Sequence, residues 1–161
     1  MIRAVFPGTF DPVTLGHEAL IIRAAELFDE IIVAVAAGFH KQAVFSLEER
    51  ERLAAESFSR ANIRVESFDG LLADFLRARR CRIILRGLRA VSDFEFESQL
   101  AHINKTLDEN IETLFLPPSH EYMHLSSTMV REIALLGGDV TKFVSSHVAA
   151  ALLEKVVPPC R

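Results

Sequence analysis

The segment Glu30–Ala37 (EIIVAVAA) is a short, nearly unbroken apolar run that is rich in β-branched residues. Such a run is typical of a strand covered on both faces, as in a parallel sheet between layers of helices. Four further short runs have a comparable character, namely Ile2–Phe6, Ile63–Phe68, Ile83–Leu85 and Ile111–Leu116. Segments with apolar residues at helical spacing separate the five runs. The sequence therefore predicts a single-domain α/β fold, a Rossmann-like open parallel five-stranded sheet with helices on both faces.

The chain length fits one domain. With 161 residues, the chain can bury about two thirds of its unfolded surface without covalent cross-links. We expect residues 1–157 to form this domain and residues 158–161 to be a frayed tail. Cys81 and Cys160 lie far apart in sequence, which suits a reduced compartment better than a disulfide scaffold.

Charge and hydropathy exclude two classes of partner. The net charge of −4 gives no general attraction to nucleic acid, so an anion site requires a local cluster of basic groups. Arg3 and Pro7 interrupt the apolar core that a signal peptide needs, and no later run approaches the ~18 residues of a membrane span. We therefore expect a soluble, cytoplasmic protein that binds neither nucleic acid nor a membrane.

Two Ser-x-x-Glu patterns mark expected helix starts. Ser46 and Glu49 open a charged helix that runs to about Arg60, and both residues are interpreted as structural. Ser92 and Glu95 open a long helix. One face of that helix carries an apolar stripe, which is either core or a contact between subunits, formed by Phe96, Leu100, Ile103 and Leu107.

A run of arginines ends the helix that contains Phe75 and Leu76. Such a run suits a solvated helix carboxyl terminus, where positive charge complements the helix dipole, better than a nucleic-acid patch. We therefore interpret as surface residues Arg77, Arg79, Arg80 and Arg82.

Several polar segments follow the expected strands. In open parallel sheets, ligands bind beyond the carboxyl ends of the strands, so segments 7–17, 38–42, 86–89 and 117–128 should converge in one cleft. The first of these joins a strand to a helix. Unpaired amides at the start of a helix bind phosphate well, and glycine at position 8 allows a close approach of the backbone.

Three motifs carry a resemblance. They are Gly8–Pro12 with Thr14–His17 (GTFDP and TLGH), Arg86–Arg89 (RGLR) and Ser126–Arg131 (SSTMVR). In their order and spacing they resemble the class I nucleotidyltransferases with the (T/H)xGH motif, and within these the phosphopantetheine adenylyltransferase family.

The resemblance extends from about Arg3 to Lys155 and includes FSLEER at 45–50 and DFEFE at 93–97. Two positions depart from the commonest pattern: Phe6 stands where tyrosine is frequent, and Thr128 replaces a serine. Neither change removes a charge.

The resemblance implies transfer of AMP from ATP to 4'-phosphopantetheine, which yields dephospho-coenzyme A and pyrophosphate. It implies Mg²⁺ held mainly by ATP phosphates, a homo-hexamer, and His17 as the catalytic residue. It assigns to the phosphopantetheine substrate Thr9, Lys41, Leu72 and Arg86. It assigns to ATP Thr9, Phe10, His17, Gly87, Leu88, Arg89, Glu97, Tyr122, Met123, His124, Leu125, Ser126, Ser127 and Thr128.

The chemistry of this reaction fixes what His17 must do. The nucleophile is a phosphate monoester whose second pKa is about 6, so it is mostly dianionic at neutral pH and needs no general base. Displacement at the α-phosphate places charge on equatorial oxygens, which fixed donors stabilise. His17 is therefore expected to donate a hydrogen bond, while Lys41 and Arg86 neutralise the incoming phosphate.

Each candidate also has a structural interpretation. The position of Lys41 is also typical of a solvent-exposed loop lysine, and that of Arg86 is also typical of an ion pair at the end of a strand. Glu97 suits a surface charge and Arg131 a pair with a neighbouring acid. Ser126–Thr128 suits a simple helix cap. We expect Asp11 to brace its turn. The histidines outside the motif are interpreted as structural, with loop contacts possible at positions 120 and 124; they are His40, His102, His120, His124 and His147.

Two rival functions share these features. One is another nucleotidyltransferase, acting on nicotinamide mononucleotide or using CTP. The other is a sensor that binds nucleotide or coenzyme A without turnover. The motif histidine and the basic residues at positions 41 and 86 favour the adenylyltransferase.

Overall fold

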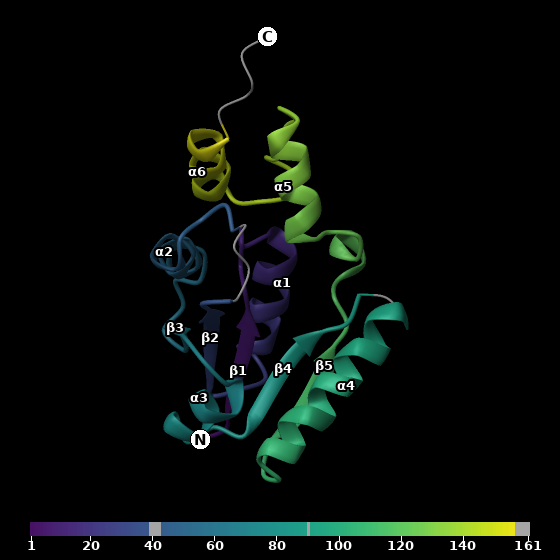
Figure 1. Ribbon diagram of the computed structural model, residues 1–161. Coiled ribbons are helices and arrows are strands. Elements are labelled where there is room, and N and C mark those ends of the chain that lie inside the picture. Colours follow the sequence, from purple (N-terminus) through teal and green to yellow (C-terminus); the bar gives the residue numbers. More distant parts are fainter. Residues whose placement is uncertain (39–42, 90, 157–161) are drawn as a thin grey trace.

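The computed structural model describes residues 1–38, 43–89 and 91–156. Lys41 and the tail at 158–161 lie outside the described residues. Figure 1 shows strands and helices that alternate along the chain. In chain order, the elements are β1 (Arg3–Gly8), α1 (Leu15–Ala24), β2 (Glu30–Ala36), α2 (Leu47–Ser57), β3 (Ile63–Phe68), α3 (Leu72–Ala78), β4 (Ile83–Gly87), α4 (Val91–Leu107), β5 (Glu112–Leu116), the 3₁₀ helix η1 (His120–Tyr122), α5 (Ser127–Leu135) and α6 (Ser146–Lys155).

The five strands form one parallel sheet in the order β3-β2-β1-β4-β5. The chain moves outward from β1 to β3 on one side and then crosses back to place β4 and β5 on the other side (Figure 1). The order therefore reverses between β1 and β4. This is the position at which open α/β sheets form ligand clefts. The predicted Rossmann-like five-stranded sheet is confirmed.

The two strands at this position separate towards their carboxyl ends. β1 pairs with β2 from Arg3–Glu30 to Gly8–Val35, but its one registered pair with β4 is Val5–Ile84. Pro7, near the end of β1, has no N–H to donate to a ladder. The carboxyl ends of β1 and β4 therefore leave room between them for a ligand.

β2 is the most buried strand, and its side chains point to both faces. Ile31, Val33 and Val35 belong to an apolar cluster that includes residues of α1, α2 and α6. Ile32 and Ala34 belong to a second cluster, on the other face, with residues of α3. Helices thus cover both faces of the sheet, as the unbroken apolar run at 30–37 predicts.

The helix ends differ from expectation. α1 ends at Ala24, and Leu27, which follows it, is 64% exposed. α2 ends at Ser57 and not near Arg60. α4 begins at Val91, one residue before the expected start at Ser92. The short η1 helix was not predicted, because three residues carry too little periodicity.

The apolar stripe of α4 faces outward. Phe96, Ile103 and Leu107 are 61%, 55% and 45% exposed. Assignment of this stripe to the core is therefore wrong for the single chain, and the alternative of a contact between subunits stays a prediction.

The arginine run lies at the surface, as predicted. Arg77 pairs with Asp74 and Asp108, and Arg79 pairs with Glu66. Arg79 also lies over the ring of Phe75, at 4.8 Å from its centroid. These pairs hold the carboxyl end of α3 against its neighbours.

Two further expectations concern cysteine and the membrane. Cys81 is a buried free thiol, and burial raises its pKa. Cys160 lies outside the described residues. Within the part of the chain that the structure describes, no helix combines the length and apolar character that crossing a membrane requires.

Candidate active site

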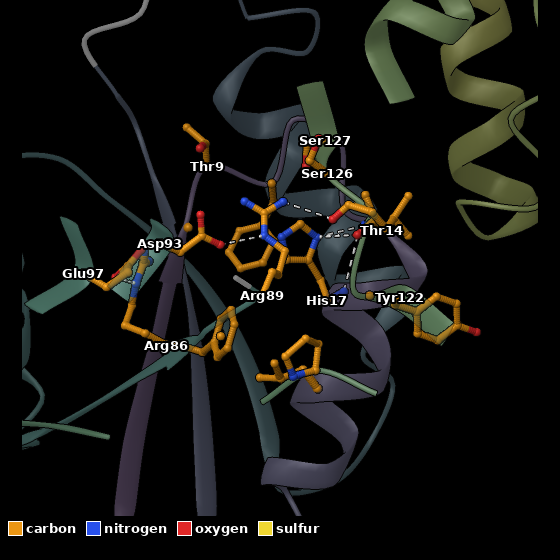
Figure 2. Close-up of a pocket in the computed structure, with 18 of the residues that line it drawn as sticks. Thr9, Thr14, His17, Arg86, Arg89, Asp93, Glu97, Tyr122, Ser126 and Ser127 are labelled. Atoms are coloured by element: carbon orange, nitrogen blue, oxygen red, sulfur yellow. Dashed lines mark hydrogen bonds and ion pairs between the residues drawn. The ribbon is translucent and has the colours of Figure 1, made fainter. Parts of the chain in front are cut away.

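A cleft of about 510 Å³ opens beyond the carboxyl ends of β1 and β4 (Figure 2). The motif segments that lie far apart in sequence converge on it, as the strand order predicts. Most of the residues assigned to substrates or ATP line this cleft, namely Thr9, Phe10, His17, Arg86, Gly87, Arg89, Glu97, Tyr122, Leu125, Ser126, Ser127 and Thr128.

A second lobe of about 270 Å³ adjoins the first. The two lobes share the Pro7–Thr9 segment and the side chains of Arg86 and Glu97. Leu72, the residue assigned to the pantetheine arm, lines only this lobe. Its other walls are mostly apolar and come from Ala36, Ile84, Leu100, Ala101, Asn104 and Thr113.

Among the described residues, three of those assigned to a substrate line neither lobe. Leu88 follows β4, and its backbone N–H donates to the carbonyl of Leu116 at the end of the edge strand β5, at 3.1 Å. Met123 and His124 lie in the loop before α5 but outside the lining of both lobes. Lys41 lies outside the described residues.

His17 belongs to a capping arrangement at the start of α1. Thr14 is the N-cap, and its side chain accepts from the backbone N–H of His17 at 3.4 Å. In return, the backbone N–H of Thr14 donates to Nδ1 of His17 at 3.1 Å. The Thr14 hydroxyl lies 2.9 Å from the same nitrogen. The imidazole thus takes the place that Glu holds in an ordinary capping box.

These contacts fix which ring nitrogen carries the proton. Because Nδ1 accepts a backbone N–H, the proton of the neutral ring resides on Nε2. Burial, together with the charges of Arg89 and Arg86, lowers the pKa of His17 to about 4. His17 is therefore a neutral ring that offers one N–H at neutral pH. The contact with Thr14 was not foreseen from the sequence, and the donor role of His17 towards a substrate stays a prediction.

The ring of Phe10 packs against the ring of His17. The two ring centroids are 5.1 Å apart in an edge-on arrangement, and Phe10 is 2% exposed. Its backbone φ is 49°, a left-handed conformation that is uncommon away from glycine. A Cβ at Gly8 would lie 3.0 Å from the Phe10 ring. The glycine at position 8 therefore makes room for this ring. It also lines both lobes, and close approach of a ligand there stays a prediction.

Packing also explains why glycine stands at position 87. A Cβ there would lie 2.9 Å from Cδ1 of Leu20 on α1. The absence of a side chain lets the end of β4 approach α1 closely, so this glycine shapes the cleft wall by packing.

Arg86 and Glu97 line both lobes, and Figure 2 shows their side chains paired with each other. Nε and Nη2 of Arg86 donate to the two carboxylate oxygens of Glu97 at 2.7 and 2.6 Å. Nη1 donates to the carbonyl of Pro7 at 2.7 Å. Glu97 is 8% exposed, so its interpretation as a surface charge is wrong, whereas the strand-end ion pair foreseen for Arg86 is present.

Arg89 lies beside His17 and bridges Asp93 and the segment before α5 (Figure 2). Its Nε lies 3.4 Å from the carboxylate of Asp93, and Nη1 donates to the carbonyl of Leu125 at 3.2 Å. Asp93 lines the cleft and was missed as a site residue. The available signal was its place four residues after Arg89, in the DFEFE stretch at 93–97.

The first turn of α5 forms the opposite wall. Ser126 is its N-cap and accepts from the N–H of Met129 at 3.2 Å. The hydroxyl of Ser127 donates to the carbonyl of Pro12 at 2.8 Å. The capping interpretation of this serine run is therefore correct, and the cap also joins α5 to the β1–α1 turn. Figure 2 shows the ring of Tyr122 directed away from His17.

Asp11 braces the turn, as expected. Its carboxylate accepts the backbone N–H groups of Val44 and Phe45 at 3.0 and 2.9 Å. Arg131 lies 3.7 Å from the same carboxylate and donates to the Asp11 carbonyl, which confirms its pairing with a neighbouring acid.

The cleft contains no protein-only metal site among the described residues, where no group of three or more His, Cys, Asp and Glu side chains converges. The two carboxylates at its wall, Asp93 and Glu97, each pair with an arginine.

The protonation of His17 can be measured directly. In ¹⁵N NMR spectra, with the signal assigned through a His17→Gln variant, the ring should stay neutral with its proton on Nε2 and titrate near pH 4. The same chain in denaturant should titrate near the ordinary value of about 6.5. A folded-state transition near that value, or a proton on Nδ1, would contradict the geometry.

Comparisons with known proteins show the family of the chain. The cytidylyltransferase-like family model matches residues 5–133. A phosphopantetheine adenylyltransferase of Cupriavidus taiwanensis is 54% identical over 160 residues, which are 99% of this chain and 99% of the relative. One of Azoarcus sp. is 56% identical over 154 residues, which are 95% of this chain and 94% of the relative.

Among solved structures, a Plasmodium falciparum nicotinic acid mononucleotide adenylyltransferase complexed with NaAD has a TM-score of 0.71. It covers 94% of each chain at 13% identity, a likeness of fold alone. The identity to the bacterial relatives over nearly the whole length is far higher, and on that ground the chain belongs to the phosphopantetheine adenylyltransferase family.

Proposed function

We propose that this chain transfers the adenylyl group of ATP to 4'-phosphopantetheine, giving dephospho-coenzyme A and pyrophosphate, with His17 as the donor that stabilises the transition state. The carrying observation is that Nδ1 of His17 accepts the N–H of Thr14, which leaves Nε2–H as the group offered to the cleft. The reaction is that of the family to which the chain belongs.

The proposed reaction is an in-line displacement. A phosphate oxygen of 4'-phosphopantetheine attacks the α-phosphorus of ATP, the bond from that phosphorus to the bridging oxygen breaks, and pyrophosphate leaves. Because the attacking phosphate is already an anion, the chain supplies position and charge stabilisation and no base. A ring with a pKa of about 4 is uncharged at neutral pH, so His17 stabilises the α-phosphate through a hydrogen bond.

The two lobes suit two substrates. We assign ATP to the larger lobe, where Arg89 and the start of α5 face His17 and can receive the outer phosphates. The apolar lobe lined by Leu72 suits the pantetheine arm. The reacting phosphates would then meet beside Thr9, which lines both lobes.

Arg86 can serve the second substrate while it stays paired. A guanidinium has five N–H groups, and three of them bond to Glu97 and Pro7, so two are left for an incoming phosphate. Glu97 thereby acts as a group that orients Arg86, an arrangement that supports the family assignment of Arg86 to 4'-phosphopantetheine. Lys41 is proposed as a second cation for that phosphate.

Three further proposals rest on the family resemblance. Mg²⁺ accompanies ATP and is held mainly by its phosphates, which agrees with the pairing of both cleft carboxylates to arginine. The enzyme acts in the cytoplasm. It assembles as a homo-hexamer, for which the exposed apolar residues of α4 offer a contact surface.

A substrate comparison tests the proposed function. The purified protein should release pyrophosphate from ATP and Mg²⁺ when 4'-phosphopantetheine is added and should not do so with nicotinamide mononucleotide. CTP in place of ATP should give little product. Pyrophosphate release from ATP with nicotinamide mononucleotide, and none with 4'-phosphopantetheine, would favour the rival nucleotidyltransferase. Saturable binding of ATP and 4'-phosphopantetheine without any pyrophosphate would favour the sensor.

Replacement of the histidine tests its role. His17→Ala should lower kcat by about 100-fold or more and change ATP affinity much less, because a donor to developing charge acts in the transition state. His102→Ala, at an exposed position on α4, serves as the control and should retain wild-type kcat. Weaker ATP binding with an unchanged kcat would assign His17 to ground-state binding and remove it from catalysis.

A further inference from the structure

Arg50 is a buried cation that neither lobe of the cleft includes. It lies on α2 and is 3% exposed. Its guanidinium donates to four backbone carbonyls: Nε to Phe45 at 3.2 Å, Nη1 to Thr9 at 2.8 Å and to Ala36 at 2.7 Å, and Nη2 to Ala37 at 3.1 Å. These carbonyls belong to three separate segments of the chain: the loop after β1, the end of β2 and the segment before α2.

Asp11 completes this buried group. Its carboxylate, 5% exposed, accepts the N–H groups of Val44 and Phe45, and its charge opposes the lowering of the Arg50 pKa that burial causes. A buried guanidinium is costly unless its donors are satisfied, and here backbone oxygens accept from four of its five N–H groups. The planar fork holds several acceptors at fixed angles, which a lysine ammonium cannot reproduce.

The Pro7–Thr9 segment is held by two arginines. Arg86 donates to the carbonyl of Pro7 from the cleft side, and Arg50 donates to the carbonyl of Thr9 from α2. Between them lies the stretch of backbone that both lobes share. A shift of this stretch would move Thr9, and with it the place where the two substrates meet.

From this arrangement we propose that Arg50 is a positioning residue for adenylyl transfer, which sets the place of Thr9 through its carbonyl. The proposal rests on the proposed function. It adds a residue that touches no substrate but fixes a segment that does. Misplacement of reacting groups by about 1 Å can lower a rate by about 100-fold, so loss of the fork should affect kcat more than substrate affinity.

The test compares two conservative changes on the same helix. Arg50→Lys keeps the charge and removes the fork, whereas Arg52→Lys changes an exposed arginine that pairs with Glu56 at 2.9 Å. With Arg50→Lys, kcat should fall by about 10-fold to 100-fold and each KM should change by less than about threefold. Arg52→Lys should leave kcat unchanged. Assays are run below the melting temperature of each variant.

A double-mutant cycle separates positioning from general stability. If Arg50 acts through Thr9, the kcat loss of Arg50→Lys combined with Thr9→Ala should be smaller than the product of the two single losses. A value of kcat for Arg50→Lys within about twofold of wild type, or fully multiplicative losses, would overturn the proposal. Should Arg50→Lys not fold, Asp11→Asn loosens the same group. It should lower kcat in the same sense, and an unchanged kcat would again overturn the proposal.

A readout without turnover distinguishes this proposal from the proposed function. In amide NMR spectra, Arg50→Lys should shift the signals of Gly8 and Thr9, and Arg52→Lys should leave them in place. If the wild-type protein has no adenylyltransferase activity, the proposed function is refuted. The amide shifts would still test whether Arg50 positions the Gly8–Thr9 backbone. Unshifted Gly8 and Thr9 signals in Arg50→Lys would refute the positioning role alone.

Discussion

The hydrogen bond from the backbone N–H of Thr14 to Nδ1 of His17 is the contact on which the account of the site depends. It uses an amide that a helix start leaves without an intrahelical partner, so one interaction both caps α1 and selects the ring tautomer. Burial and two neighbouring arginines then keep the ring uncharged. The result is a donor of fixed direction and fixed protonation, as stabilisation of an anionic transition state requires.

The sheet order determines where this donor meets its substrates. β1 and β4 lie side by side but diverge beyond Val5–Ile84, and the cleft occupies the space between their carboxyl ends. Arg86 bridges this space from β4 to the carbonyl of Pro7, and Glu97 orients the guanidinium. On the other side of β1, Arg50 binds the carbonyls of Thr9 and Ala36. Where strand pairing ends, two guanidinium groups thus hold the end of β1 to its neighbours: Arg86 on the β4 side and Arg50 on the β2 side.

Much of the fold could be predicted because each strand carries a local signal. The run at 30–37 has no polar alternation, and burial of both faces of β2 follows from that. The motif segments could be placed in one cleft because parallel strands bring their carboxyl ends together. The outward face of α4 could not be settled, since periodicity shows that a helix has an apolar side and not what covers it.

The supporting contacts of the site were harder to foresee. The carbonyls that Arg50 binds come from residues distant in sequence, and no local pattern encodes such a group. A signal was nonetheless present, because position 50 falls on the same helical face as Leu47, Leu53 and Ala54, where a charged residue is unusual. Thr14 and His17 likewise have the spacing of a capping box, with histidine in place of glutamate.

A crystal structure of the protein with Mg²⁺ and a non-hydrolysable ATP analogue tests the central claim most directly. The account predicts that Nε2 of His17 lies about 2.7 to 3.1 Å from an α-phosphate oxygen while Nδ1 keeps its contact with the N–H of Thr14. A ring that has turned to present Nδ1 to the nucleotide, or an α-phosphate beyond hydrogen-bond reach of His17, would contradict it.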